Sequence, residues 1–296
     1  MYIELIKIRA KLFEKIRCFF ADKKVLEVDT PHLGSSSVSD PNVDSITCGS
    51  EYLQTSPELY MKQLLCHGSG DIYQLAHVFR NEVKSQLHKK EFMMLEWYRL
   101  GFNMHELISE VMLLIDYLLP QKNQQIISYE EAFKKHTDIH NVLNCSDKTL
   151  QAYWEKNKQQ TITVNMSRDD WLNLLMVDFI EPNLIGATII HSFPKSQASL
   201  AKIKGNISLR FELYIDGVEL ANGFEELQSS EEQRQRFVLE NAQRVRNNQP
   251  QIKINEDFLH ALKKPGLPKS SGVALGIDRL LMILLGKKDI AEVNLF

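Results

Sequence analysis

The amino-acid sequence predicts an α+β protein built around a mainly antiparallel sheet. Residues 72–82 and 92–98 are rich in β-forming side chains and are separated by a polar loop, which is typical of a long hairpin. A second hairpin is indicated by Asp216-Gly217, a two-residue turn signal between two further apolar runs. Signals for parallel β-α-β units are fewer than signals for strands, and this balance favours an antiparallel sheet.

The elements of the N-terminal part follow from apolar spacing and from turn-forming residues. Apolar residues that recur every three or four positions indicate a helix, and a cluster of Ser, Asp and Pro indicates a loop. Pro57 stands where a first helical turn accepts proline. The elements expected are a helix over 3–20 that ends near 21–23, a strand over 25–28 closed by Thr30 and Pro31, a loop over 34–42 and a helix over 59–66.

A capping signal opens the next helix. Asn103 is followed three positions later by Glu106, which predicts a capped helix that continues to Leu119. The polar stretch of about 121–160 has weak periodicity, and we expect it to be a helical insertion in a single domain spanning 1–296. The elements expected beyond it are a helix over 167–180, a strand over 187–193, a loop over 266–268 and a glycine-interrupted strand leading into an apolar helix.

The composition is typical of a cytoplasmic enzyme. Of 296 residues, 44% are hydrophobic and 25% charged, and no apolar run is long enough to cross a membrane. Charged residues interrupt the apolar ones at the N-terminus, unlike in a signal peptide. A net charge of -3 argues against the broad basic face of an RNA-binding protein, and the four cysteines form no CxxC pair, which favours neither a zinc site nor a disulfide framework.

The hairpin around Asp216-Gly217 is expected to bring two glutamates together. A two-residue turn pairs Tyr214 with Glu219, so that Glu212 and Glu219 become diagonal neighbours on one face. Two such carboxylates repel each other unless a cation lies between them, and Mg²⁺ carrying nucleotide phosphates suits one or two carboxylates. A solvated acidic face, or a pair with a nearby lysine, is the alternative that the hairpin alone leaves open.

The first hairpin carries a second group of candidates. Arg80 and Glu82 share a strand face by alternation, and an arginine fork can hold a phosphate or carboxylate through two hydrogen bonds. On the returning strand, Phe92, Glu96 and Tyr98 also share one face. A surface ion pair and a core aromatic stripe are the alternative interpretations.

Residues 272–279, GVALGIDR, alternate small and apolar residues, which lets a flat ligand approach the backbone closely. Arg279 follows at the junction of strand and helix, where it could stack on an adenine ring or reach a phosphate. A tightly packed core strand is the alternative. The spacing is not GxGxxG and no GKS or GKT occurs, so Rossmann and P-loop folds are not supported.

The order of these features resembles the three signature motifs of class II aminoacyl-tRNA synthetases: a helix and strand ending in Pro31, FRNE with a returning aromatic strand, and GIDR before a helix. Within that class, TSPELYMK, FRNE with EFMMLEWY, FELYIDGVELANGFEEL and SGVALGIDR resemble the lysyl-tRNA synthetase branch. They are most similar to its paralogous family, the ligases that attach (R)-β-lysine to elongation factor P, and the similarity covers essentially the whole chain.

The resemblance implies a class II catalytic fold and a role for each matching residue. The catalytic residues implied are Arg80 and Arg279; the substrate-binding residues are Ser56, Pro57, Glu58, Tyr98, Glu219, Asn222, Glu226 and Ala274; the ATP-binding residues are Arg80, Asn81, Glu82, His88, Lys89, Phe92, Glu212, Leu213, Gly276 and Arg279; and Glu212 and Glu219 would serve Mg²⁺. Phe92 and Arg279 would sandwich the adenine, and Glu58 and Glu226 would suit a diamino acid, whose ammonium groups need partners once desolvated.

Two positions depart from the synthetase pattern. The motif 2 loop usually contains His-Asn-Pro-Glu-Phe, whereas here Lys89 replaces the asparagine that contacts ATP. Ala274 stands where lysyl-tRNA synthetases usually carry glycine, and the ligase paralogues also carry alanine. The second departure therefore favours the ligases and should reshape the amino-acid pocket.

The resemblance also implies a reaction and its partners. We expect ATP and Mg²⁺ to activate (R)-β-lysine as an adenylate, followed by transfer to a lysine of elongation factor P, in a cytoplasmic homodimer formed through motif 1. Because motif 1 begins within the first helix, we expect no anticodon-binding domain and no stable binding of tRNA. The alternatives are an α-lysine-activating enzyme that acts on tRNA or a small amine, and an inactive regulatory paralogue.

Overall fold

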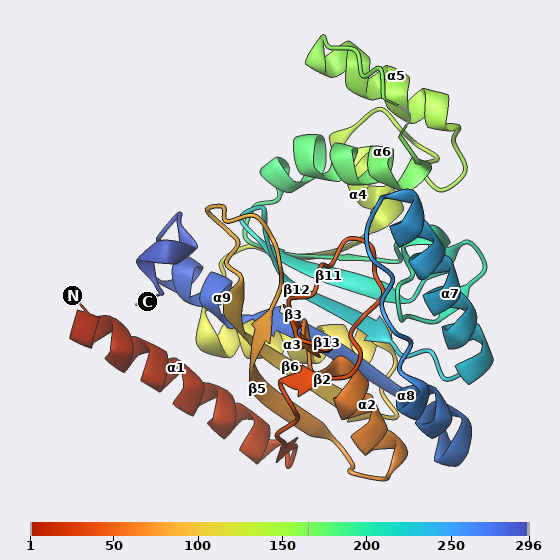
Figure 1. The fold of residues 1–296 in the computed structure, drawn as a ribbon. Helices are drawn as coiled ribbons and strands as arrows, with labels where there is room; N and C mark the ends of the chain where they lie inside the picture. The colour runs from red at the N-terminus through yellow and green to blue at the C-terminus, as the bar shows by residue number, and fades with distance from the viewer. Residues whose placement is uncertain (1, 165, 295–296) are drawn as a thin grey trace. The chain divides into compact units, whose positions relative to one another are not determined.

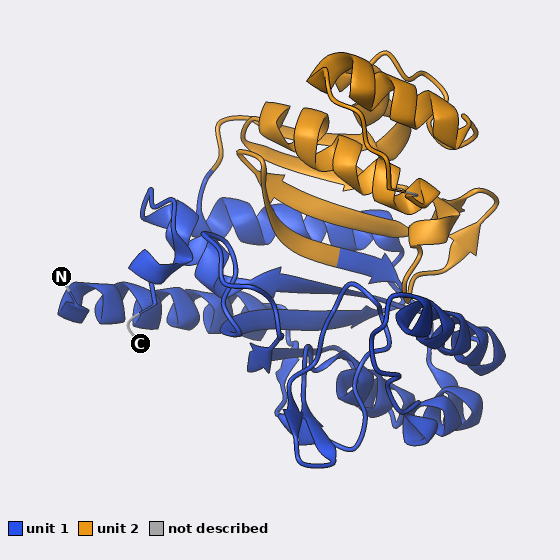
Figure 2. Cartoon of the chain, turned by 45° about the horizontal axis from the view of Figure 1, so that its top comes forward, with its two compact units in different colours: residues 1–120, 223–296 blue, residues 121–222 orange. Residues whose placement is uncertain are grey.

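The structure, a computed structural model, describes residues 2–164 and 166–294. The chain forms two compact units, which Figure 2 colours separately. Unit 1 comprises Met1–Pro120 and Gly223–Phe296, and unit 2 comprises Gln121–Asn222. Across the described residues, no helix combines the length and apolar character that a membrane span requires.

The sheet of unit 1 has its strands in the order β1, β5, β6 and β13 (Figure 1). Strands β5 (Ile72–Phe79) and β6 (Glu91–Leu100) form the long antiparallel hairpin predicted from the sequence. On its other side β6 pairs antiparallel with β13 (Ser270–Gly276), and the short β1 (Leu26–Glu27) pairs parallel with β5. The prediction of a mainly antiparallel sheet is confirmed here.

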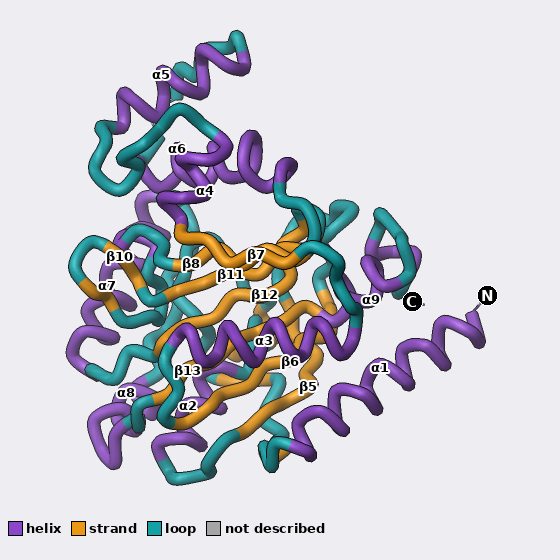
Figure 3. Tube along the Cα trace, turned by 180° about the vertical axis from the view of Figure 1, so that it is seen from behind, coloured by secondary structure: helices purple, strands orange, loops and turns teal. Residues whose placement is uncertain are grey.

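Two helices of unit 1 pack against this sheet. Helix α1 (Tyr2–Asp22) ends where the sequence predicted, and Phe20 near its end stacks on Tyr73 of β5 with ring centroids 4.4 Å apart. Phe20 also meets Trp97 of β6 edge-on, at 5.4 Å. Helix α3 (Met104–Leu118) contacts β13 and α1, and Figure 3 shows it lying across the strands.

The capping box predicted before α3 is confirmed. The Asn103 side chain accepts a hydrogen bond from the Glu106 backbone N–H at 3.0 Å, and the Glu106 carboxylate accepts one from the Asn103 N–H at 2.7 Å. Both bonds satisfy N–H groups that have no partner inside the helix. Helix α3 therefore begins at a fixed position, directly after the end of β6.

The remaining elements of unit 1 are short strands and helices, and one of the helices holds a polar loop in place. Arg244 is buried and donates to the Asp40 carbonyl at 3.1 Å and to the Asp44 carboxylate at 3.0 Å, so its helix anchors the polar loop predicted over 34–42. These elements are β2 (Leu33–Gly34), β3 (Thr47–Cys48), β4 (Glu51–Leu53), α2 (Glu58–Cys66), α7 (Ser230–Arg246), α8 (Glu256–Ala261), η4 (Leu262–Gly266), α9 (Ile277–Leu284) and η5 (Ile290–Glu292).

Unit 2 contains strands in the order β12, β11, β8 and β7. Its strand bounds are β7 (Gln124–Ser128), β8 (Ala187–His191), β9 (Ile203–Lys204), β10 (Ile207–Ser208), β11 (Arg210–Ile215) and β12 (Val218–Glu225), the last of which runs beyond the end of the unit. Strand β11 pairs antiparallel and β7 parallel with β8. Asp216 and Gly217 between β11 and β12 have φ of 47° and 79°, and two such residues are the mark of the predicted tight hairpin turn.

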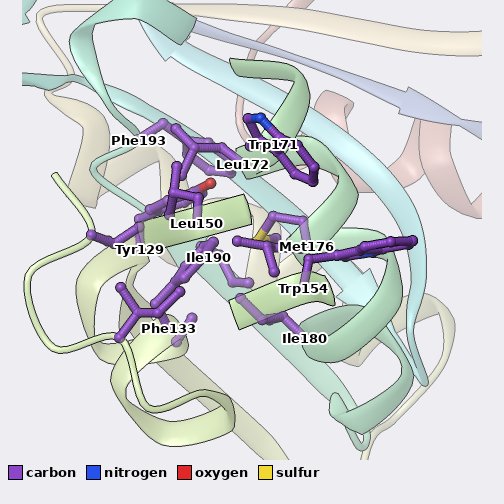
Figure 4. Packing of buried hydrophobic residues seen from close by; sticks show 14 of the residues in the cluster. Tyr129, Phe133, Leu150, Trp154, Trp171, Leu172, Met176, Ile180, Ile190 and Phe193 are labelled. Carbon is purple, nitrogen blue, oxygen red and sulfur yellow. The ribbon is translucent and has the colours of Figure 1, made fainter. Parts of the chain in front are cut away.

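The helices of unit 2 pack around one aromatic core (Figure 4). Tyr129, Phe133, Trp154 and Trp171 contribute buried rings to it, and the Trp154 indole donates to Asp178 at 2.6 Å. The helical elements are α4 (Tyr129–His136), α5 (Asp147–Lys158), α6 (Arg168–Leu175), η1 (Met176–Ile180), η2 (Glu181–Asn183) and η3 (Lys195–Gln197). The stretch of about 121–160, expected to be helical, thus also contains β7, whose backbone partner is the later strand β8.

We expect Asn103→Ala to lower the free energy of unfolding by about 1 kcal/mol, because the substitution removes the acceptor of the capping box. Chemical denaturation of the variant and the parent measures the change. Asn103→Ser is the matched control, since a serine hydroxyl can accept the same bond, and it should retain most of the stability. Equal losses in both variants would contradict the capping role.

Candidate active site

The register of β6 and β13 places several predicted side chains on one face of the unit 1 sheet. Gly272 lies opposite Tyr98, and Ala274 lies opposite Glu96. Directly paired residues of antiparallel strands point to the same face. Gly276 follows on that face at the end of β13, so the glycine-interrupted strand lines the same surface as the aromatic strand.

Glu96 is the centre of a buried hydrogen-bond network on this face. Its two carboxylate oxygens accept from the Tyr98 hydroxyl and the Ser56 hydroxyl, each at 2.6 Å. Ser56 also accepts from the Glu58 backbone N–H at 3.0 Å, which links the network to the start of α2. The prediction that Glu96 and Tyr98 share one face is therefore confirmed, and Ser56 and Glu58 are brought beside them.

A lysine that the sequence analysis did not single out completes this cluster. The Lys62 ammonium lies 2.6 Å from a Glu58 carboxylate oxygen, one turn earlier on α2. It also lies 2.5 Å from Glu226 Oε2, in a second ion pair. The side chains of Lys62 and Glu226 are only 2% and 1% exposed, so both charges are out of contact with water.

The burial of these groups changes their proton affinities. Burial raises the pKa of Glu96 to about 7 and that of Glu226 to about 8, because a carboxylate loses its hydration, and Glu58 adds to the rise in both. Burial by itself lowers the pKa of Lys62, but the carboxylates of Glu226 and Glu58 outweigh it and raise the pKa above its ordinary value. Lys62 is therefore a permanent cation, whereas Glu96 and Glu226 titrate near neutral pH.

Gly272 lets this cluster pack against β13. A Cβ atom at this position would lie 2.2 Å from Tyr98 Cε1 and 2.8 Å from Glu226 Oε1, closer than side chains can approach. The same Glu226 oxygen is buried and has no hydrogen-bond partner among the described residues. A buried carboxylate oxygen without a donor is costly unless a ligand supplies one.

Arg80 and Glu82 do not lie on a strand, because β5 ends at Phe79, and the prediction that they share a strand face is wrong. The backbone of Arg80 still bonds to the returning segment at Lys90, but the chain then leaves the ladder. The Arg80 guanidinium donates to the Thr55 carbonyl at 3.3 Å and lies 5.3 Å from the centroid of the Phe92 ring. Its Nη1 is 3.9 Å from a Glu82 oxygen.

Arg279 joins the same region from the start of α9. Its guanidinium lies 2.9 Å from His88 Nε2 and donates to the Leu87 carbonyl at 3.2 Å. His88 in turn is 3.5 Å from a Glu82 oxygen. Burial and the nearby cations of Arg279 and Arg80 lower the pKa of His88, which favours its neutral form. The structure thus brings together Arg80, Glu82, His88 and Arg279, in agreement with their predicted grouping.

Asn81 and Lys89 are the remaining candidates in the loop between β5 and β6. Asn81 donates its backbone N–H to the Asp44 carbonyl at 2.8 Å and accepts from Lys90 at 2.9 Å. Lys89 and Phe92 line a hollow of about 510 Å³ whose other cationic residues are Arg9, Lys84 and Lys90. The position usually held by asparagine in the synthetases is therefore in a basic environment in this chain.

Four candidates belong to unit 2. Glu212 is buried and forms an ion pair with Arg210 and a hydrogen bond of 2.5 Å from the Tyr214 hydroxyl. Burial raises the pKa of Glu212, Arg210 opposes this rise, and Glu219 adds to it, so the two glutamates interact. The side chain of Leu213 points to the other face and is fully buried, which leaves only its backbone for a nucleotide, while Asn222 accepts from Arg210 at 3.1 Å.

These contacts bear on the magnesium hypothesis. Among residues 2–164 and 166–294, no group of three or more His, Cys, Asp or Glu side chains could hold a metal ion. An Mg²⁺ that arrives with nucleotide phosphates needs only one or two carboxylates, and the interacting pair Glu212 and Glu219 fits that requirement. Arg210 is the cation beside Glu212 in the structure, whereas the sequence analysis considered a lysine for that place.

Comparisons with known proteins identify the family of this chain. A family model described as tRNA synthetases class II (D, K and N) matches residues 1–296. The Elongation factor P--(R)-beta-lysine ligase of Proteus mirabilis is 42% identical over 303 residues, which cover 97% of this chain and 93% of that protein. Proteins of the same name from Photorhabdus laumondii and Edwardsiella ictaluri are 41% and 42% identical, with the same coverage.

We expect the free energy of unfolding of the ligand-free protein to fall as the pH rises from about 5.5 to about 8.5. Folded Glu96 and Glu226 keep their protons to about pH 7 and 8, whereas an unfolded glutamate loses its proton near about pH 4.3. The folded state therefore binds more protons in this range, and raising the pH favours unfolding. Lys62 is protonated in both states and adds no slope.

Chemical denaturation at several pH values measures this slope. Glu96→Gln should flatten it, because one of the titrating groups is removed. Glu130→Gln, an exposed change on α4, should leave it unchanged. A stability that rises with pH, or equal slopes in both variants, would refute the assignment.

Proposed function

Because this chain belongs to the class II tRNA synthetases of the D, K and N group, we propose that it activates (R)-β-lysine with ATP and transfers it to a lysine of elongation factor P. The buried acidic cluster around Lys62 is the observation that carries the proposal. Three glutamates at the base of one sheet face suit a ligand with two ammonium groups. The relatives at about 40% identity carry this activity in their names.

The amine-recognising end of the pocket consists of groups from three elements. Glu58 at the start of α2, Tyr98 on β6 and Glu226 after β12 contact or neighbour one another there. Ser56 and Pro57 fix the start of α2, and Ala274 would limit the shape of the site. This set would bind the two ammonium groups and leave the substrate carboxylate free to react.

The activation step would be governed by positioning and charge. The substrate carboxylate oxygen attacks the α-phosphorus of ATP, the bond from that phosphorus to the bridging oxygen breaks, and pyrophosphate leaves. Arg80 would hold the α-phosphate and the carboxylate, and Arg279 with Phe92 would hold the adenine and the phosphates. Mg²⁺ beside Glu212 and Glu219 would neutralise phosphate charge.

The second step would form an amide. The neutral ε-amine of the acceptor lysine attacks the carbonyl carbon of the adenylate, the carbon–oxygen bond to AMP breaks, and the amine proton is released. The acceptor is a translation factor, so the enzyme would act in the cytoplasm. A homodimer through α1 and Pro31 would follow the class II pattern, and the exposed apolar residues Tyr2, Ile3 and Ile6 on α1 support it.

Intact mass spectrometry of elongation factor P tests the proposal. After incubation with this protein, Mg²⁺-ATP and (R)-β-lysine, we expect a mass gain of one lysyl group, and a smaller yield with α-lysine. Omission of ATP is the control and should abolish the gain. A lysyl-tRNA product in a parallel reaction, with unmodified elongation factor P, would favour the synthetase alternative, and no product in either would favour an inactive paralogue.

Arg279→Lys should lower the rate of lysine-dependent exchange between ATP and pyrophosphate by about 100-fold, because an ammonium cannot reproduce the planar fork. The exchange assay reports adenylate formation alone. Arg234→Lys, which alters an exposed ion pair with Glu256, is the matched control and should retain full activity. Full exchange in Arg279→Lys would exclude this arginine from the activation step.

A further inference from the structure

Lys62 occupies a position that the proposed chemistry does not use directly. It contacts no reacting group, yet it is 1% exposed and lies between two carboxylates of the amine pocket. An ion pair at such a depth seldom stabilises a fold more than apolar residues of the same volume would. A role in setting the charge of the pocket explains its presence better than a role in stability.

The charges of the cluster do not balance. Glu58, Glu96 and Glu226 supply three carboxylates, and Lys62 supplies one ammonium, so full ionisation would leave two negative charges buried. Uncompensated charge in such an environment is strongly disfavoured, and the group takes up a proton instead. A diamino acid brings two ammonium groups, which is the charge that the ionised cluster lacks.

The three carboxylates of the cluster differ in the groups that contact them. Lys62 holds Glu58 Oε1 and Glu226 Oε2, while two hydroxyls hold Glu96. Glu226 Oε1 is the buried oxygen without a hydrogen-bond donor among the described residues, beside Gly272. This oxygen is the acceptor that an incoming ammonium would meet.

We propose that Lys62 is a positioning residue, a built-in ammonium that ties Glu58 to Glu226 and limits the pocket to two free negative charges, so that an amine ligand binds by displacing protons from the carboxylates. The inference deepens the proposed function, because it rests on a diamino acid as the ligand. Glu96 and Glu226 are the groups that release the protons, since both are buried and burial raises the pKa of each into the neutral range.

Glu240 is a further titratable group beside the cluster that can release a proton near neutral pH. It lies on α7 and interacts with Glu58, and burial raises its pKa to about 7. Its carboxylate accepts a hydrogen bond from Ser39 at 2.5 Å. Cys66 on α2 has its pKa raised to about 11 by burial, and Tyr98 has its pKa raised well above the ordinary value, so both stay neutral.

Calorimetry of the full-length protein with (R)-β-lysine, in two buffers of different ionisation enthalpy, counts the protons exchanged. We expect a net release of about one proton or more per ligand near neutral pH, and an affinity that rises with pH between about 6 and 8.5, by up to about tenfold per unit for each proton released. A β-amino acid of equal length without the side-chain amine should release fewer. Binding of (R)-β-lysine without net proton release would overturn the inference.

Lys62→Met removes the charge and keeps an unbranched side chain of similar length. We expect the pH at which lysine binding reaches half its maximum to move upward by about one unit, equivalent to about tenfold weaker binding near neutral pH. Lys62→Arg should restore the parent profile in part, whereas Lys156→Met, on the exposed face of α5, should match the parent. A Lys62→Met protein with lower stability but an unchanged pH profile would show a merely structural lysine and refute the role.

The outcomes separate this inference from the proposed function. Proton-coupled binding of lysine without transfer to elongation factor P would retain the role of Lys62 and remove the proposed acceptor. Transfer to elongation factor P with proton-independent binding of lysine would retain the proposed acceptor and refute the role of Lys62. Failure of both lysine isomers to bind would overturn both, and if Lys62→Met does not fold, the proton count of the parent protein decides alone.

Discussion

Strand β6 is hydrogen-bonded on both sides, to β5 and to β13, and this register places the strand residues of the buried acidic cluster in unit 1. The pairing sets Glu96 opposite Ala274 and Tyr98 opposite Gly272, and a slip of one residue would turn all of these side chains to the other face. The aromatic packing of Phe20 on the opposite side of the sheet disfavours such a slip. A property of the backbone thus fixes the arrangement of the charged groups.

The register alone would create an unfavourable site, because it buries carboxylates close together. Their stabilisation comes from three different sources: hydroxyl donors for Glu96, the Lys62 ammonium for Glu58 and Glu226, and protons where neither suffices. The first two are fixed by the fold, and the third varies with pH and with ligand. The same groups can therefore be tolerated in the free protein and be available to a substrate.

Much of the fold could be predicted because its signals are local. The two hairpins, the capping box before α3 and the shared face of Glu96 and Tyr98 all depend on residues close together in the sequence. Strand β7 could not be predicted, because it is stabilised by pairing with β8, far along the chain. The end of β5 at Phe79 was also missed, since the β-rich composition continues through the loop that carries Arg80.

Residues of the candidate site could likewise be predicted only where their signals are local in the sequence. The motifs predicted Arg80, Glu82, His88 and Arg279 as one nucleotide-binding group, and the structure places them within contact distance of one another. Lys62 was overlooked because a lysine four residues after a glutamate is common on exposed helices. Only its burial against Glu226, a residue more than 150 positions later, distinguishes it, and no local pattern contains that contact.

The close approach of Gly272 to the Tyr98 ring has a consequence for how this protein can change over evolutionary time. Two of the atoms that a side chain at position 272 would meet belong to the ring itself, so replacing the tyrosine by phenylalanine would create no room, and the third is Glu226 Oε1. A larger residue at this position of β13 therefore requires the loss of the ring, and with it the hydroxyl that holds Glu96, and a shift of Glu226. A lineage that acquires a side chain at position 272 must therefore change two neighbouring strands, and the change on β13 made first would clash with the ring.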